Sequence, residues 1–193
     1  MSTPRSAGRP RSPEVDAAIL SAAARLLAEE GYARMSIDAV ASAAGVSRTA
    51  IYRRFASKAD VATAALVHLI DNRSPRPAAD LDVEAALTRA LEHLARRLRA
   101  KNSMALVGTL LVEEEQTPEL ITLFRERVWA FRADLLREIL DRARTRGEVR
   151  DDVDNDVVIG MLIGSLYAAH LGHGKIPRNW PARVVKSALD GAR

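Results

Sequence analysis

The sequence contains no cysteine among its 193 residues, which excludes a disulfide scaffold and any thiolate metal or redox site. Aromatic side chains are scarce, at 4% of the chain. No apolar run reaches the roughly 18 residues that a membrane-spanning helix needs, and the longest, 157–169, contains two glycines and a serine. The basic N-terminal residues lack the apolar core of a secretion signal, so we expect a cytoplasmic protein without membrane association.

The net charge is only +4, but two segments carry basic side chains and no acidic one. The first precedes Glu14 and consists of Arg5, Arg9 and Arg11. The second spans residues 45–58 and consists of Arg48, Arg53, Arg54 and Lys58. Acid-free basic segments on a nearly neutral protein favour nucleic acid as a partner, although a solvated helix face gives the same pattern.

Apolar residues recur with helical spacing along most of the chain, and the sequence shows no strand-length alternation. We therefore expect an all-α protein with a flexible basic arm at 1–12, a first domain at 13–73 and a larger second domain at 74–193. The linker between the domains is predicted around Pro75 and Pro77. Further helices are predicted at 81–100, 103–115, 118–146, 154–173 and 180–190, with caps at Asp80, Thr117 and Asn179.

Within the first domain, residues 36–55 have the pattern of a helix-turn-helix. Ser36 and Ser47 are suitable N-caps for two short helices, and Gly45 between them permits the positive φ of a tight turn. Ile51 is spaced to hold the second of these helices against the first. The pattern predicts a small helical unit with one face of its last helix pointing outward.

The outer side of that last helix carries side chains that can donate hydrogen bonds to DNA base edges and phosphates. These candidates are Arg48, Thr49, Tyr52 and Arg53, and Arg54 belongs to the same basic segment. Ser47 and Lys58 stand at helix N-termini, where backbone N–H groups and the helix dipole favour phosphate. A helical hairpin with a merely solvated outer helix gives similar spacing, so the pattern alone leaves that alternative open.

Residues 13–66 resemble the DNA-binding domain of the TetR family of bacterial regulators. The resemblance rests on the stretch 19–32, on Gly45-Val46-Ser47 and on Tyr52, Phe55 and Lys58. It implies a three-helix DNA-binding domain, a helical-bundle domain for ligand binding and dimerisation, and a homodimer. Such a protein is expected to repress transcription from a palindromic operator in double-stranded DNA until a small effector binds.

The resemblance also implies roles for individual residues. Base or phosphate contacts are assigned to Ser47, Arg48, Thr49, Tyr52 and Lys58, and a contact with the DNA backbone is assigned to Ser36. Arg5, Arg9 and Arg11 of the arm are expected to add phosphate or minor-groove contacts. A helix predicted at 58–71 would carry the effect of a ligand to the DNA, because it is the regular element expected to span both domains.

Small residues form a stripe along the helix predicted at 154–173, and such a stripe permits close approach of another helix. We expect a dimer interface made by this stripe and the last helix, consisting of Gly160, Gly164, Ala168, Leu171, Trp180, Val184 and Ala188. Packing inside a single chain is the alternative explanation.

A mostly apolar effector pocket is predicted from residues of the second domain, namely Met104, Leu111, Phe124, Phe131, Ile163, Tyr167 and His170. Residues at helical spacing also form ordinary cores, and that alternative applies to each of them. The identity of the effector is not predicted.

Two other functions fit parts of the sequence. A ligand-independent, nucleoid-associated DNA-binding protein would use the second domain only as a dimer scaffold. A small all-helical enzyme would need a catalytic grouping, and the sequence shows none, so we expect no enzymatic activity. His170 and His173 lack further ligands for a metal ion, so we expect neither a metal site nor a cofactor.

Overall fold

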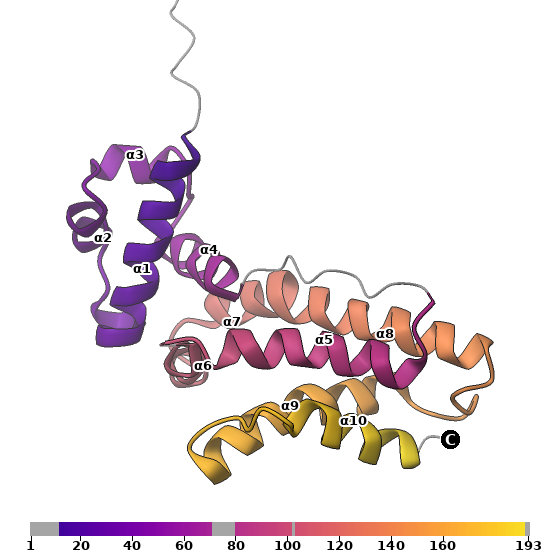
Figure 1. Ribbon diagram of the computed structural model, residues 1–193. Helices are drawn as coiled ribbons and strands as arrows, with labels where there is room; N and C mark the ends of the chain where they lie inside the picture. The colour runs from indigo at the N-terminus through magenta and orange to yellow at the C-terminus, as the bar shows by residue number, and fades with distance from the viewer. Residues whose placement is uncertain (1–11, 71–79, 102, 192–193) are drawn as a thin grey trace, which may run out of the picture.

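The computed structural model describes residues 12–70, 80–101 and 103–191, and every regular element in these ranges is a helix. This confirms the all-α prediction. Figure 1 shows a small N-terminal group of helices at one end of a longer helical bundle. Arg5, Arg9 and Arg11 of the predicted arm, and Pro75 and Pro77 of the predicted linker, lie outside the described residues.

The N-terminal group consists of α1 (Pro13–Arg34), α2 (Ile37–Ala44), α3 (Arg48–Tyr52) and α4 (Lys58–Ile70). The caps predicted at Ser36 and Ser47 are confirmed, whereas Thr117 and Asn179 precede their helices without a side-chain capping hydrogen bond. The side-chain oxygen of Ser36 accepts a hydrogen bond from the backbone N–H of Ala39, and that of Ser47 accepts one from Ala50, each at 3.1 Å. Gly45 adopts φ 66° and ψ 32° between α2 and α3, a left-handed conformation that glycine adopts without strain.

The second part of the chain contains α5 (Val83–Leu98), α6 (Ser103–Val112), α7 (Pro118–Phe124), α8 (Ala130–Thr145), α9 (Asn155–His173) and α10 (Trp180–Asp190). The single helix expected at 118–146 is interrupted by a π-helical turn, η1 (Arg125–Trp129). Asp82 rather than Asp80 caps α5, because its side chain accepts a hydrogen bond from the Ala85 N–H at 2.7 Å. None of the described helices is long and apolar enough to cross a membrane.

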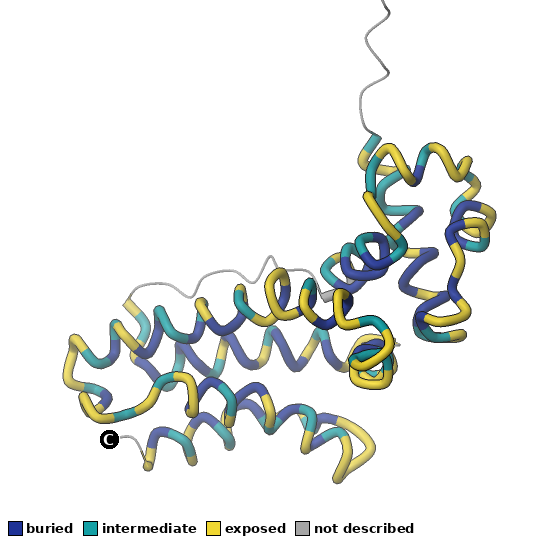
Figure 2. The backbone as a smooth tube through the Cα atoms, turned by 180° about the vertical axis from the view of Figure 1, so that it is seen from behind, coloured by how far each residue is buried: buried dark blue, intermediate teal, exposed yellow. Residues whose placement is uncertain are grey.

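Two hydrophobic cores hold the helices together, and buried residues follow their inner sides in Figure 2. The first core contains residues of all four helices from α1 to α4. It also contains residues of α6, α7 and η1, which are Leu106, Leu110, Leu120, Ile121, Phe124 and Val128. The second core joins α5, α8, α9 and α10. The N-terminal helices therefore share a core with residues from the middle of the chain.

This arrangement extends the expected link between the two parts of the protein. The helix at the end of the first domain, α4, packs against α7 and η1, and α1 packs against α6. A displacement of α6 or α7 therefore presses on two helices of the N-terminal group rather than on α4 alone.

Candidate DNA-binding site

The short helix α3 is anchored by Ile51, which is fully buried in the first core. Its outer face carries the four exposed side chains of Arg48, Thr49, Tyr52 and Arg53. α3 lies at the outer end of the N-terminal group (Figure 1), and these four side chains are exposed there. They are residue types that read base edges in the major groove of DNA.

Arg48 lies between two neighbours on this surface. Its Nη1 is 3.0 Å from Oδ2 of Asp38, and its guanidinium carbon lies 5.5 Å from the centre of the Tyr52 ring. Tyr52 and Asp38 together raise the pKa of Arg48, so the guanidinium stays charged. Both members of the Arg48–Asp38 pair are exposed, and an exposed pair can exchange for a contact with DNA at little cost.

Arg54 has a different environment from the other basic side chains of this segment. Its Nε donates a hydrogen bond to Asp16 of α1 at 2.5 Å, its Nη1 donates one to the Ala50 carbonyl at 2.9 Å, and its side chain is 14% exposed. Arg54 therefore fastens α3 to α1, and its charge belongs inside the domain rather than on the outer face where the sequence suggested a DNA contact.

Lys58 is the first residue of α4 and is half-buried. Its Nζ lies 4.2 Å from the centre of the Tyr32 ring and 3.4 Å from the Ala33 carbonyl oxygen. Burial is the main cause that raises the pKa of Tyr32 to about 12, so its ring remains neutral beneath the ammonium group. The cation is thus held in place at the N-terminus of a long helix, where a phosphate is favoured.

The turn before α4 is organised by a capping box made by Ser57 and Asp60. The Ser57 hydroxyl oxygen accepts a hydrogen bond from the Asp60 N–H at 3.0 Å, and the Asp60 carboxylate accepts one from the Ala56 N–H at 3.2 Å. The other carboxylate oxygen of Asp60 pairs with Arg127 of η1 at 2.7 Å. This ion pair, which the sequence did not indicate, connects the turn after α3 directly to the second part of the chain.

The hydroxyl groups of Ser36 and Ser47 are used as acceptors in capping, but a hydroxyl also carries a hydrogen that can be donated. Ser36 is the N-cap of α2 and Ser47 is the N-cap of α3, and both residues are exposed. Each can therefore donate to a DNA phosphate without giving up its cap.

The structure does not bring the predicted pocket residues together in one cavity. Met104 and His170 line a cavity of about 860 Å³ between the end of α5, the start of α6 and the loop after α9. Phe124 lies in the first core and Ile163 in the second. Leu111 and Phe131 are 64% and 41% exposed, and neither lines this cavity. Tyr167 is half-buried beside Arg132.

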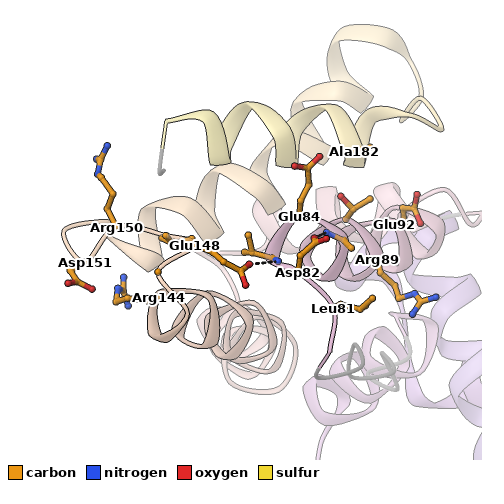
Figure 3. A pocket seen from close by; sticks show the side chains of 15 residues that line it. Leu81, Asp82, Glu84, Arg89, Glu92, Arg144, Glu148, Arg150, Asp151 and Ala182 are labelled. Carbon is orange, nitrogen blue, oxygen red and sulfur yellow. Dashed lines mark hydrogen bonds between the residues drawn. The ribbon is translucent and has the colours of Figure 1, made fainter.

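A larger groove of about 1200 Å³ lies where the start of α5 meets the loop after α8 (Figure 3). Two of its charged side chains, Glu148 and Arg144, hold neighbouring segments of the chain together. Glu148 accepts a hydrogen bond from the Val83 N–H at 2.8 Å, and Arg144 donates to the Val153 carbonyl and to Asn155 at 2.7 and 2.9 Å. The groove differs from the apolar pocket that the sequence predicted.

The predicted small-residue stripe lies on the outer side of α9. A Cβ atom at Gly160 or Gly164 would meet no atom of the described chain within 4 Å, so packing within the chain does not explain these glycines. Ala168 and Leu171 are exposed, and the same surface includes Val157 and Met161, which are 56% and 57% exposed and were missed from the sequence. The half-buried residues of α10 pack partly against the second core; these are Trp180, Val184 and Ala188.

Comparison with known proteins places the chain in one family. Residues 19–65 match the family described as "Bacterial regulatory proteins, tetR family", and residues 77–188 match "Tetracyclin repressor-like, C-terminal domain". The transcriptional regulator YdeS of Bacillus subtilis is 30% identical over 96% of this chain and 93% of its own length. The regulator Rv1556 of Mycobacterium tuberculosis is 30% identical over 89% of this chain and 81% of its own.

Solved structures agree with the sequence relatives. The crystal structure of the TetR family transcription regulator SCO0332 has a TM-score of 0.68 and 28% identity to this protein, over 93% of this chain and 99% of that one. The helix-turn-helix, the matched families and the relatives identify a DNA-binding transcriptional regulator and not an enzyme. The chain therefore belongs to the TetR family of bacterial transcriptional regulators.

Proposed function

We propose that this protein is a homodimeric repressor that reads a palindromic operator with α3 and leaves it when a small ligand binds. The observation that carries the proposal is the outer face of α3, where Arg48, Thr49, Tyr52 and Arg53 are exposed on a helix anchored by the buried Ile51. In this reading, α3 contacts bases, and Lys58, Ser36 and Ser47 contact phosphates around it.

The outer surface of α9 supports the dimer. It presents Val157, Met161 and Leu171 to solvent, and Gly164 between them has open space above it. A second copy of the same helix fits this surface because the glycines let two backbones approach closely while the larger side chains pack around them. A two-fold axis through this contact gives each dimer two copies of α3, which suits an operator with two half-sites.

The shared first core supports release by a ligand. A ligand that displaces α6, α7 or η1 would move α1 and α4, since these elements pack on one another. The Arg127–Asp60 ion pair adds a direct connection from η1 to the turn that follows α3. In a dimer this motion would change the spacing of the two α3 helices, and half-sites one helical turn apart, about 34–36 Å, tolerate little change.

The test is to select DNA fragments from a random-sequence pool with the full-length protein. The proposal predicts enrichment of an inverted repeat whose half-sites lie about one helical turn apart, bound by one dimer. Enrichment of no sequence, together with similar affinity for all fragments, would instead favour the nucleoid-associated alternative and refute operator recognition.

A further inference from the structure

Arg132 of α8 is buried in the helical bundle, with 7% of its surface exposed. Its neighbours are the Tyr167 side chain of α9, which is its hydrogen-bonding partner, and the guanidinium of Arg97 on α5. Within the described residues Arg132 forms no ion pair with a carboxylate, and its Nη2 atom has no hydrogen-bond partner. Burial and the second guanidinium lower the pKa of Arg132.

An isolated buried guanidinium is unfavourable, because it has lost its water and no carboxylate attracts it in return. An anion placed at Nη2 would supply both the missing hydrogen bond and the missing charge. The Tyr167 hydroxyl can donate to the same anion. The cluster of Arg132, Tyr167 and Arg97 therefore has the chemistry of a binding site for an anionic group.

Residues that follow Arg97 and Tyr167 along their helices line a cavity. The 860 Å³ cavity is lined by Leu98, which follows Arg97 on α5, and by His170, which lies one helical turn after Tyr167 on α9. Its wall contains three further basic residues and no acidic residue; they are Arg99, Lys175 and Arg178. Burial, and after it the charge of Arg178, lowers the pKa of Arg99.

The rest of the cavity wall is apolar, with Leu98, Met104, Ala105 and Ile176 among its lining residues. We propose that the effector of this regulator is a small molecule with one anionic group on an apolar body, and that the anionic group binds Arg132 and Tyr167. The apolar body would then occupy the 860 Å³ cavity, whose wall includes Leu98 and His170 but neither Arg132 nor Tyr167. This inference rests on the proposed function, because it names the chemical class of the ligand that releases the protein from DNA.

The position of Arg132 suits such a role. It lies less than one turn after η1, and π-helical turns inside α-helices occur frequently at functional sites. Val128 of η1 is fully buried in the first core, and Arg127 of η1 pairs with Asp60 at the start of α4. A ligand that pulls on Arg132 therefore acts on the segment that contacts the DNA-proximal helices.

The test uses the full-length protein and three carboxylates: octanoate, decanoate and 4-phenylbutyrate. Each is compared with its own primary amide, which has the same body without the charge. A ligand at ten times its dissociation constant raises the Tm of a chain of this size by about 3–6 °C. We expect at least one carboxylate to raise the Tm by this amount and its amide to raise it by much less.

Two variants of α8 separate a binding role from a structural one. Arg132→Met keeps the apolar stem and removes the charge, so the carboxylate should lose its advantage over the amide while the ligand-free Tm stays equal or rises. Arg137→Met is the matched control, because Arg137 is an exposed arginine of the same helix that pairs with Asp134 and Asp156. It should keep the full response. Tyr167→Phe should reduce the response without abolishing it.

Three results would overturn the inference: no carboxylate exceeds its amide, Arg132→Met responds like the wild type, or Arg132→Met lowers the ligand-free Tm or fails to fold. Operator affinity is measured on the same samples with the selected DNA. If a carboxylate raises the Tm through Arg132 but changes operator affinity by less than twofold, the anion-binding site is confirmed and release from DNA by this ligand is refuted.

If the protein selects no operator, the proposed function is refuted, and the Tm measurements still show whether Arg132 binds an anion.

Discussion

The variant Gly164→Leu separates the stability of the protomer from the stability of the dimer. A Cβ atom at Gly164 would meet no atom of the described residues of its own chain within 4 Å, so the position is open to a larger side chain. Replacing a glycine inside a helix by a good helix former stabilises the protomer by about 0.5–1 kcal/mol, and the Tm should rise by about 1–4 °C. A destabilised protomer would show that α9 packs against something within its own chain.

The effect on the dimer should have the opposite sign. An extra side chain forced into a closely packed contact costs about 1–3 kcal/mol, and a two-fold axis introduces the change twice, giving about 2–6 kcal/mol. The dimer dissociation constant should therefore rise by roughly 30-fold to 20,000-fold.

Light scattering and sedimentation at micromolar concentration measure this change directly. Gly108→Leu in α6 is the matched control, since Gly108 is also an exposed helical glycine with no atom of the chain within 4 Å of its Cβ position. Its variant should remain as dimeric as the wild type. A Gly164→Leu protein that remains a dimer with unchanged affinity would refute the assignment of this face of α9 to the interface.

Three further predictions concern the N-terminal group. Arg54→Met should lower the free energy of unfolding by about 1–3 kcal/mol in urea titrations, because Asp16 loses its partner inside the domain; unchanged stability would contradict the structural role of Arg54. Lys58→Met removes the charge but keeps the packing on the Tyr32 ring. The variant should bind operator and random DNA more weakly to the same degree, and the slope of log binding constant against log salt concentration should fall by roughly one. A loss of affinity for the operator alone would contradict a phosphate contact. A double-mutant cycle of Arg127→Ala and Asp60→Ala should give a coupling of about 0.5–1 kcal/mol in the free energy of unfolding, because the ion pair is partly shielded from solvent. A coupling near zero would show that the pair does not connect η1 to α4.

The helix-turn-helix could be predicted from the sequence because its signals act over a few residues. Ser36 and Ser47 bond to N–H groups three residues ahead, and Gly45 sets one turn by its own backbone conformation. The stripe of small residues on α9 could also be predicted from the sequence, because a glycine at helical spacing leaves a position without a side chain whatever the rest of the fold is.

The remaining features depend on contacts between distant segments. Arg54 reads as one more basic residue in a DNA-binding segment, yet its partner Asp16 lies 38 positions away. Leu111 and Phe124 have similar helical surroundings in the sequence, but only the packing of α6 and α7 on α1 and α4 decides that the first is exposed and the second buried. Arg132 gave no signal at all, because its burial comes from the assembly of α5, α8 and α9.

The most direct test of the central claim is the affinity of the Arg48→Ala variant for the selected operator and for random DNA of the same length. If the exposed face of α3 reads bases, the variant should lose roughly 5- to 150-fold on the operator, the discrimination of one bidentate base contact. Its affinity for random DNA should fall only by the few-fold expected for one lost charge. An equal loss on both DNAs, or no loss on either, would contradict the assignment of this face to operator recognition.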